Sequence, residues 1–293
     1  MTPLVSVVTG TYNGAGYLED SLQSVLDQRE VEIELIVVDD GSTDGSSEIL
    51  ARLASSDRRV RLLQQENLGL TRALIRGCAE ARGTYIARHD SDDVSLPGRL
   101  ESQVATLSND AALSFVSCYA QFIGPRDEPL YVSKGPADPG EAMRRLRSGK
   151  GGPACHGATM FRADAYRSAG GYRQEFRYVQ DWDLWLRLSE MGGFAFVPKI
   201  SYRYRVRENS ISAVRRSQQD RLGLVAMRCA KARMAGVSDA PHLEEAAQIS
   251  AEVVPVQSSR KSTSYFIARC LLGNGDVRGL RYLWKAIVSA VGL

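Results

Sequence analysis

Apolar and polar residues alternate in regular blocks over the first 110 positions of the chain. Four short apolar runs have the length and the β-branched content of buried strands: residues 5–9, 33–38, 60–63 and 85–88. Between these runs, apolar residues recur at helical spacing, as Leu18, Leu22 and Val25 do. Because four strands alternate with helices across short loops, the pattern predicts a parallel, doubly wound α/β sheet.

The pattern becomes less regular after residue 111. Apolar runs predict three more strands and a helix: strands at 113–123, with a bulge, at 156–161 and at 202–207, and the helix at 181–191. From about residue 214 the sequence is helical in character and basic in places. We therefore expect one domain over residues 1–213, with halves at 1–110 and 111–213, and a helical C-terminal extension over 214–293.

The composition is that of an ordinary globular protein, with 44% hydrophobic and 24% charged residues. A formal net charge of +3 gives no reason to expect nucleic acid as a partner. The cysteines are odd in number and widely separated, which is typical of reduced thiols rather than of a disulfide frame or a zinc site: Cys78, Cys118, Cys155, Cys229 and Cys270. The three histidines have no mutual spacing that would form a metal cage.

The expected location is the cytoplasm, with peripheral contact at the inner face of the cell membrane as an open possibility. No apolar run approaches the ~18 residues that span a bilayer, and the N-terminus lacks the basic region of a signal peptide. Residues 278–288 are amphipathic and cationic. Such a helix can lie on an anionic membrane surface or pack on its own domain, and both readings stay open.

Unusual polar residues follow three of the four predicted N-terminal strands. They are Thr11-Tyr12-Asn13, Asp39-Asp40 and Asp90-Ser91-Asp92-Asp93. Each group alone could turn the chain or cap a helix, as Ser42 or Thr43 is expected to do for the second helix. Parallel α/β sheets bind ligands beyond the carboxyl ends of their strands. Three such groups at one rim therefore favour a binding site there.

The acidic group at residues 90–93 has the composition of a cation site. Asp90 and Asp92 are two positions apart, so that in an extended segment they face the same side. Three crowded carboxylates repel one another unless a positive charge sits among them. Mg²⁺ or Mn²⁺ would supply that charge and would bring phosphate oxygens with it. The alternative is an acidic loop that turns the chain and caps the helix after Pro97.

Several residues of the second half admit both a structural and a functional role. Asp181 begins a predicted helix, where the helix dipole favours a carboxylate. His156 either packs on its strand or contacts an acceptor. Gly171 belongs to a glycine turn that permits close approach of a ligand. At strand period, Arg205 shares a face with the arginines two positions away on either side, which suits phosphates or a solvated strand surface.

Taken in order, these segments resemble the inverting family-2 glycosyltransferases of the GT-A fold. The matching segments cover about the first 210 residues: 5–8, 11–13, 37–44, 67–69 with Arg72, 90–93, 96–97, 99–100, 160–162, 170–172, 180–185 and 204–205. The resemblance implies a mostly parallel Rossmann-like sheet with flanking helices. It assigns nucleotide binding to residues 1–110 and acceptor binding to residues 111–213.

The resemblance also implies a role for each matching residue. Asp92, the second aspartate of the DxD motif, would bind Mn²⁺ or Mg²⁺, and Asp181 would be the catalytic base. Asp40 would contact the base of the nucleotide. The remaining nucleotide contacts would be Thr11, Tyr12, Asn13, Asn67, Arg72, Asp90 and Ser91. Contacts to the acceptor or the diphosphate would come from His156, Gly171, Trp182 and Arg205.

Two positions depart from the family's pattern. Gln180 stands where the family usually has a glutamate before the base, so that a charge is missing beside Asp181. Arg207 stands where the family often has a histidine, two positions after the arginine aligned with Arg205. The second departure bears on contact with the metal or with the diphosphate.

The predicted function is transfer of a sugar from a nucleotide-sugar, most commonly UDP-linked in this family, to a hydroxyl of a glycan or lipid-linked acceptor. The departing diphosphate needs positive charge, and the attacking hydroxyl needs a base such as Asp181. Inversion and a role in surface polysaccharide synthesis come from the resemblance. A catalytically silent nucleotide- or glycan-binding member is the alternative. A sugar-1-phosphate nucleotidyltransferase is disfavoured because Gly14-Ala15-Gly16 is too short for its phosphate loop and lacks an arginine.

Overall fold

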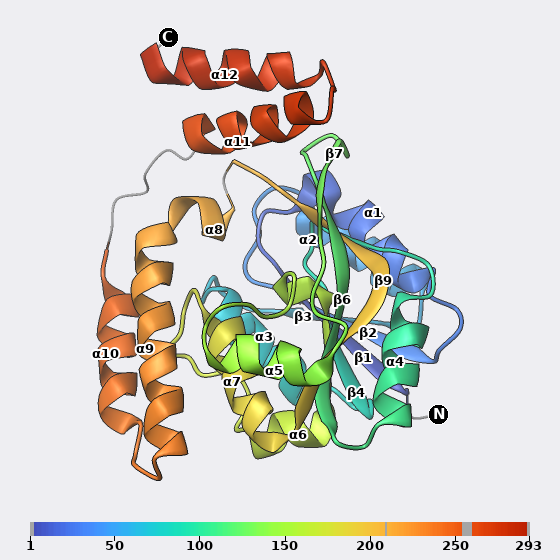
Figure 1. Ribbon diagram of the computed structural model, residues 1–293. Coiled ribbons are helices and arrows are strands. Elements are labelled where there is room, and N and C mark those ends of the chain that lie inside the picture. Colours follow the sequence, from blue (N-terminus) through green and yellow to red (C-terminus); the bar gives the residue numbers. More distant parts are fainter. Residues whose placement is uncertain (1–2, 209, 254–259, 292–293) are drawn as a thin grey trace.

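A single mixed sheet of nine strands organises the described residues of the computed structural model, which are 3–208, 210–253 and 260–291 (Figure 1). The strand order is β3-β2-β1-β4-β8-β6-β9-β5, with β7 paired to β6. The N-terminal part is parallel, as the alternating pattern predicts, and consists of β1 (Val5–Thr11), β2 (Ile33–Asp39), β3 (Val60–Gln64) and β4 (Tyr85–Arg88). The carboxyl ends of these four strands therefore lie at one rim.

The second half of the sheet contains both parallel and antiparallel pairs. Strand β8 (Thr159–Arg162) runs antiparallel between β4 and β6 (Leu113–Ile123). Strand β9 (Gly193–Arg205) pairs parallel to β6, with register shifts that produce the expected bulge. The short β5 (Val94–Ser95) pairs with β9, and β7 (Pro129–Ser133) forms a hairpin with β6. The pairing of β5 with β9 joins the loop after β4 to the end of β9.

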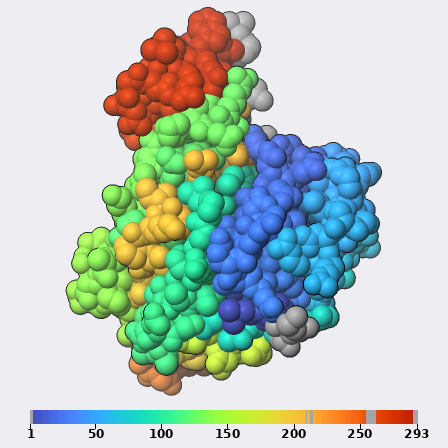
Figure 2. All heavy atoms as spheres, turned by 90° about the vertical axis from the view of Figure 1, so that its right-hand side faces the viewer, coloured from blue at the N-terminus to red at the C-terminus, as the bar shows by residue number. Residues whose placement is uncertain are grey.

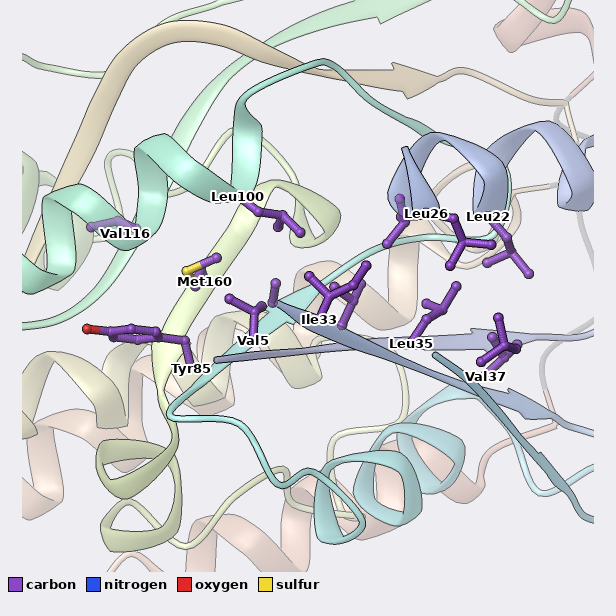
Figure 3. Packing of buried hydrophobic residues seen from close by; sticks show 14 of the residues in the cluster. Val5, Leu22, Leu26, Ile33, Leu35, Val37, Tyr85, Leu100, Val116 and Met160 are labelled. Atoms are coloured by element: carbon purple, nitrogen blue, oxygen red, sulfur yellow. The ribbon is translucent and has the colours of Figure 1, made fainter. Parts of the chain in front are cut away.

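Helices cover both faces of the sheet. One face packs against α1 (Ala15–Leu26), α2 (Ser46–Ser56) and α4 (Arg99–Asn109), where Leu22, Leu26 and Leu100 meet the strand residues shown in Figure 3. The other face packs against α3, α5, α6 and α7. Their bounds are Leu70–Ala79, Pro139–Arg147, Ala163–Ser168 and Gln180–Met191. The buried apolar runs thus form strands that contact helices on both sides.

Two local predictions are wrong. The segment predicted as a strand at 156–161 begins with a 3-10 helix, His156–Ala158, and only Thr159–Arg162 pairs in the sheet. Neither Ser42 nor Thr43 caps α2, because the chain enters that helix through Gly45 in a left-handed conformation. Ser42 instead accepts a hydrogen bond from the backbone of the β1–α1 loop.

The C-terminal helices pack on two separate parts of the sheet domain. Helices α9 (Arg216–Met234) and α10 (Ala240–Ala251) follow the short α8 (Ile211–Val214) and share a core with Phe176 and Leu186 of the α7 region. Helices α11 (Arg260–Gly273) and α12 (Gly279–Val291) pack on the β6–β7 hairpin and project at the end of the molecule (Figures 1 and 2). No helix in the described part of the chain is long and apolar enough to cross a membrane.

Candidate active site

The acidic group after β4 forms a tight turn. The backbone N–H of Asp93 donates to the carbonyl of Asp90 over 3.1 Å, and Asp90 N–H donates to Tyr202 Oη over 3.1 Å. The expectation that Asp90 and Asp92 share a side because the segment is extended is therefore wrong. The turn sends their carboxylates to different partners.

Asp90 and Asp92 each form an ion pair with an arginine. Asp90 pairs with the fully buried Arg88, and Asp92 pairs with Arg207. The main chain of Arg205 donates to Asp93 over 2.8 Å, and its Nε donates to the Asp92 carbonyl over 2.8 Å. Arginines of this chain therefore provide the positive charge that three crowded carboxylates require.

Burial has a strong effect on two of these carboxyl groups. It raises the pKa of Asp92, which Arg207 lowers in part and Asp90 raises further. It raises the pKa of Asp93 well above its usual range, and the neighbouring Asp92 and Asp90 add to that effect. Asp93 Oδ2 has no hydrogen-bond partner among the described residues. The site thus holds little negative charge beyond what its arginines balance.

Two arginine side chains lie over the aromatic ring of Tyr17 in α1: Arg205, at the end of β9, and Arg207, two residues beyond it. The Arg205 guanidinium lies 4.5 Å from the ring centroid and that of Arg207 lies 5.8 Å from it. Arg205 is also anchored by an ion pair to Asp127 at 2.8 Å. Sequence reasoning missed Tyr17, because a tyrosine in a helix carries no signal for a partner elsewhere in the chain.

The end of β1 and the loop after it hold three of the predicted nucleotide contacts. Thr11 is buried at 4% exposure, whereas the Tyr12 side chain is 50% exposed beside it. Asn13 has a positive φ of 51° and accepts a hydrogen bond from the Thr43 N–H over 2.7 Å. This bond joins the loops that follow β1 and β2 into one surface. An exposed aromatic ring on that surface offers a stacking face for a nucleobase.

Asp40 organises the loop before α3. Its carboxylate accepts hydrogen bonds from the backbone N–H groups of Leu68 and Gly69, at 2.9 and 2.8 Å. These bonds fix the loop directly after Asn67, an exposed residue that is predicted to contact the nucleotide. Arg72 is exposed on α3, and Ser91 is partly exposed in the DxD turn. The structure therefore brings the predicted nucleotide contacts to the same rim, on the loops that follow β1, β2, β3 and β4.

A buried polar chain runs behind Asp90. His156 Nε2 accepts from Arg88 Nε over 3.3 Å and lies 2.6 Å from Tyr172 Oη. Burial, with Arg88 close by, lowers the pKa of His156 well below its usual range, so that the imidazole is neutral. Sequence reasoning identified His156 but missed Arg88 and Tyr172, since a buried arginine at a strand end looks like any strand terminus in the sequence.

Asp181 is the second residue of α7 and is partly buried. Its Oδ1 accepts a hydrogen bond from the Trp182 N–H over 2.8 Å. Burial raises the pKa of Asp181 to about 6; Asp90 raises it further, while Arg88 lowers it. Because these charges act on Asp181, the α7 carboxylate and the DxD turn belong to one electrostatic site. A carboxyl group with a pKa near neutrality is suited to general base catalysis.

A surface cavity of about 430 Å³ opens beside Asp181. Trp182, Trp185 and Tyr178 line it from the sheet domain, and Met227 lines it from α9. The two tryptophan rings meet edge to face, with centroids 6.1 Å apart. An apolar, aromatic wall next to a carboxylate is suited to a sugar ring whose hydroxyl must be deprotonated.

Gly171 is buried and lies against a side chain of the protein. It has a φ of +66°, and a Cβ there would lie 2.9 Å from Tyr166 Oη. This packing accounts for the glycine without a ligand. The Arg205 guanidinium likewise contacts groups of the protein: it pairs with Asp127, lies over the Tyr17 ring and donates to the Asp92 carbonyl. Both residues lie near the site, but their contacts are internal.

Comparison with known proteins now decides the family. Residues 6–170 match the profile of Glycosyl transferase family 2. The chain belongs to this family. It is 39% identical over 226 residues to a putative glycosyltransferase, EpsE, of Bacillus subtilis strain 168. The aligned residues cover 73% of this chain and 77% of that protein. A second family member from the same strain, the putative teichuronic acid biosynthesis glycosyltransferase TuaG, is 32% identical over 216 residues, or 72% and 82% of the two chains.

Solved structures of glycosyltransferases share the fold. The S. aureus TarS fragment 1–349 in complex with UDP-GlcNAc superposes with a TM-score of 0.63 at 15% identity, over 98% of this chain and 92% of that one. The mannosyltransferase PcManGT from Pyrobaculum calidifontis, in complex with GDP-Man and Mn²⁺, gives 0.60 at 20% identity, over 99% and 81%. The predicted fold is confirmed as that of GT-A glycosyltransferases.

Proposed function

We propose that this family-2 glycosyltransferase moves a sugar from a nucleoside-diphosphate sugar to a hydroxyl of a glycan or lipid-linked acceptor, with inversion of the anomeric centre. A UDP-sugar is the proposed donor. The observation that carries the proposal is Asp181, a carboxylate with a pKa of about 6 beside an open aromatic cavity. It responds to the charge of Asp90, which belongs to the turn after β4. The proposed base is therefore close enough to the proposed donor rim for their charges to interact.

The donor site is assigned to the rim formed by residues 1–110. Tyr12 supplies a stacking face for the base, and Asp40 orders the loop around it. The nucleotide contacts proposed to complete the site are Thr11, Asn13, Asn67, Arg72, Asp90 and Ser91. Support comes from the structural relatives, which were solved with UDP-GlcNAc and with GDP-Man.

The cation site is assigned to Asp92. No group of three or more acidic, histidine or cysteine side chains suited to a metal ion occurs in the described residues, so Asp92 would not act within a full protein cage of ligands. Mg²⁺ and similar ions are commonly held by one or two carboxylates together with substrate phosphates. The residues thus fit Mn²⁺ or Mg²⁺ that arrives with the donor, as in the Mn²⁺ complex of the mannosyltransferase. The bound cation would neutralise charge on the departing diphosphate.

The acceptor half is assigned to residues 111–213. The acceptor sugar would lie in the cavity at Trp182, with its hydroxyl directed to Asp181. Asp181 would take the hydroxyl proton as the oxygen attacks the anomeric carbon from the side opposite the diphosphate, which inverts that centre. His156, neutral and held by Arg88, supports the wall behind the site. Gly171 and Arg205 would support the acceptor and the diphosphate through the backbone turn and the guanidinium that their internal contacts hold in position.

The proposed setting is synthesis of a surface polysaccharide at the cytoplasmic face of the membrane, which the likeness to TuaG supports. Helix α12 offers a membrane contact. Leu280, Trp284 and Ile287 are exposed at 58%, 67% and 49%, and their spacing of four and three places them on one face. Lys285 lies beside them and is also exposed. An exposed apolar stripe flanked by a cation is suited to an anionic lipid surface.

The test is release of nucleoside diphosphate from UDP-, dTDP-, GDP- and CDP-linked sugars, with and without glycan acceptors. One donor class should be consumed by the wild type and not by Asp181→Asn. Asp220→Asn is the matched control, because Asp220 lines the same cavity from α9. Nucleotide binding without turnover of any donor would instead favour the silent binding protein.

A further inference from the structure

The turn after β4 contains its own counter-ions, and they are not equally fixed. Arg88 is fully buried and contacts the carbonyls of Val8 and His89 as well as Asp90. Arg205 is 6% exposed and is anchored by Asp127. Neither guanidinium can leave without exposing several unpaired groups, since a buried donor that loses its partner costs free energy.

Arg207 is held much more lightly. It lies two residues beyond the end of β9, and its side chain is 35% exposed. Its described contacts are the ion pair with Asp92 and a distant approach to the Tyr17 ring at 5.8 Å, against 4.5 Å for Arg205. A long side chain with one ionic partner and a third of its surface in water can reorient at small cost.

The Asp92 carboxylate cannot keep its ion pair with Arg207 and also bind a divalent cation at full strength. A cation that binds Asp92 replaces the guanidinium and leaves Arg207 without its partner. No group of three or more acidic, histidine or cysteine side chains suited to a metal ion occurs among the described residues, so the protein offers that cation fewer than three such ligands. Water would have to supply the remaining ligands, so a cation alone gains little from the exchange.

A nucleoside diphosphate changes this balance. Its phosphate oxygens complete the coordination of the cation, and they also offer a new anionic partner to the displaced guanidinium. We propose that Arg207 is the resident counter-ion of Asp92 and competes with the divalent cation for this carboxylate, so that the protein takes up the cation only together with the diphosphate. The identity of the diphosphate rests on the proposed function, whereas the competition at Asp92 does not.

The experiment measures Mn²⁺ binding to the donor-free protein by electron paramagnetic resonance. The wild type should bind Mn²⁺ weakly, and Arg207→Ala should bind it at least about tenfold more tightly, because removing a competitor raises the apparent affinity by mass action. Arg207→Gln, which keeps a polar side chain without the charge, repeats the test if the alanine variant folds poorly. Lys199→Ala removes an exposed cation from the same strand and should match the wild type.

Two further measurements fix the site and separate the hypotheses. Adding Asp92→Asn to Arg207→Ala should abolish the gained affinity, and adding UDP to the wild type should raise Mn²⁺ affinity by about tenfold or more. Equal Mn²⁺ affinity of the wild type and both Arg207 variants would overturn the competition. If no nucleotide binds while the Arg207 variants still gain Mn²⁺ affinity, the proposed donor is wrong and the competition stands.

Discussion

Replacing Asp181 by asparagine should raise stability while it abolishes transfer. The pKa of Asp181 is raised from 3.8 to about 6, chiefly by burial. At about 1.4 kcal/mol per unit this corresponds to about 3 kcal/mol of destabilisation when the carboxylate is charged. Since the side chain is only partly buried, solvent screening reduces the expected gain for Asp181→Asn to about 1–2 kcal/mol at pH 7.5.

The gain should depend on pH in a defined direction. Between 3.8 and about 6 the folded protein holds the Asp181 proton while the unfolded chain releases it, so the stability of the wild type falls as pH rises through this window. The advantage of Asp181→Asn is therefore complete above about pH 6 and disappears towards pH 4. Transfer by the wild type should rise over the same window, because the base must be ionised to accept a proton.

Thermal unfolding and turnover measure the two effects on the same samples. A melting temperature higher by about 2–5 °C at pH 7.5 is expected for a chain of this size, and the difference should shrink towards zero as the pH falls to about 4. Donor consumption should fall about 10²- to 10⁴-fold while nucleotide affinity is retained. Full transfer by Asp181→Asn would remove this residue from catalysis, and a lower melting temperature at pH 7.5 would show that the carboxylate is not strained by burial.

Three further substitutions test the fold around the site. Gly41→Ala should cost about 1–2 kcal/mol in urea unfolding, because Gly41 has a φ of +78° and a Cβ would lie 3.0 Å from the Asn67 backbone nitrogen; an unchanged midpoint would mean that the loop relaxes freely. Arg88→Met should cost about 3 kcal/mol in the same measurement, since it leaves Asp90 and His156 without their buried partner; a neutral result would contradict the role of Arg88 as an anchor. Trp284→Ser should weaken binding to anionic vesicles at low salt at least about tenfold with no change in melting temperature. Failure of the wild-type protein to bind such vesicles would contradict the proposed membrane contact.

The N-terminal half of the fold could be predicted from the sequence because three of its four strands, β1, β2 and β4, are buried on both faces and the strands alternate with helices across short loops. The periodicity of α1 and the apolar run of β2 are local signals. The second half gave weaker signals. Strand β5 has two residues and β7 is largely exposed, so neither shows a clear apolar run. The first part of β9 was missed because proline and lysine interrupt its apolar pattern.

The candidate site could be predicted in its acidic residues but not in their partners. Aspartates after strands identify the rim, since the rim follows from the order of strands and helices. The cation that faces Asp92 is Arg207, which lies far along the chain. Arg88, which faces Asp90, is local, but its partner His156 is distant in the sequence. Three crowded carboxylates require positive charge nearby, and the structure supplies it with arginines. The sequence could not distinguish such arginines, at and beyond the end of β9, from a metal ion.

Binding of a nucleoside diphosphate at the rim can be measured by calorimetric titration. UDP, dTDP, GDP and CDP would each be titrated into the wild type with Mn²⁺, with Mg²⁺ and with chelator, and into Asp92→Ala. We expect one nucleotide to bind with Mn²⁺ or Mg²⁺ and its affinity to collapse with chelator and in Asp92→Ala. Absence of binding by all four nucleotides, under every condition, would contradict it.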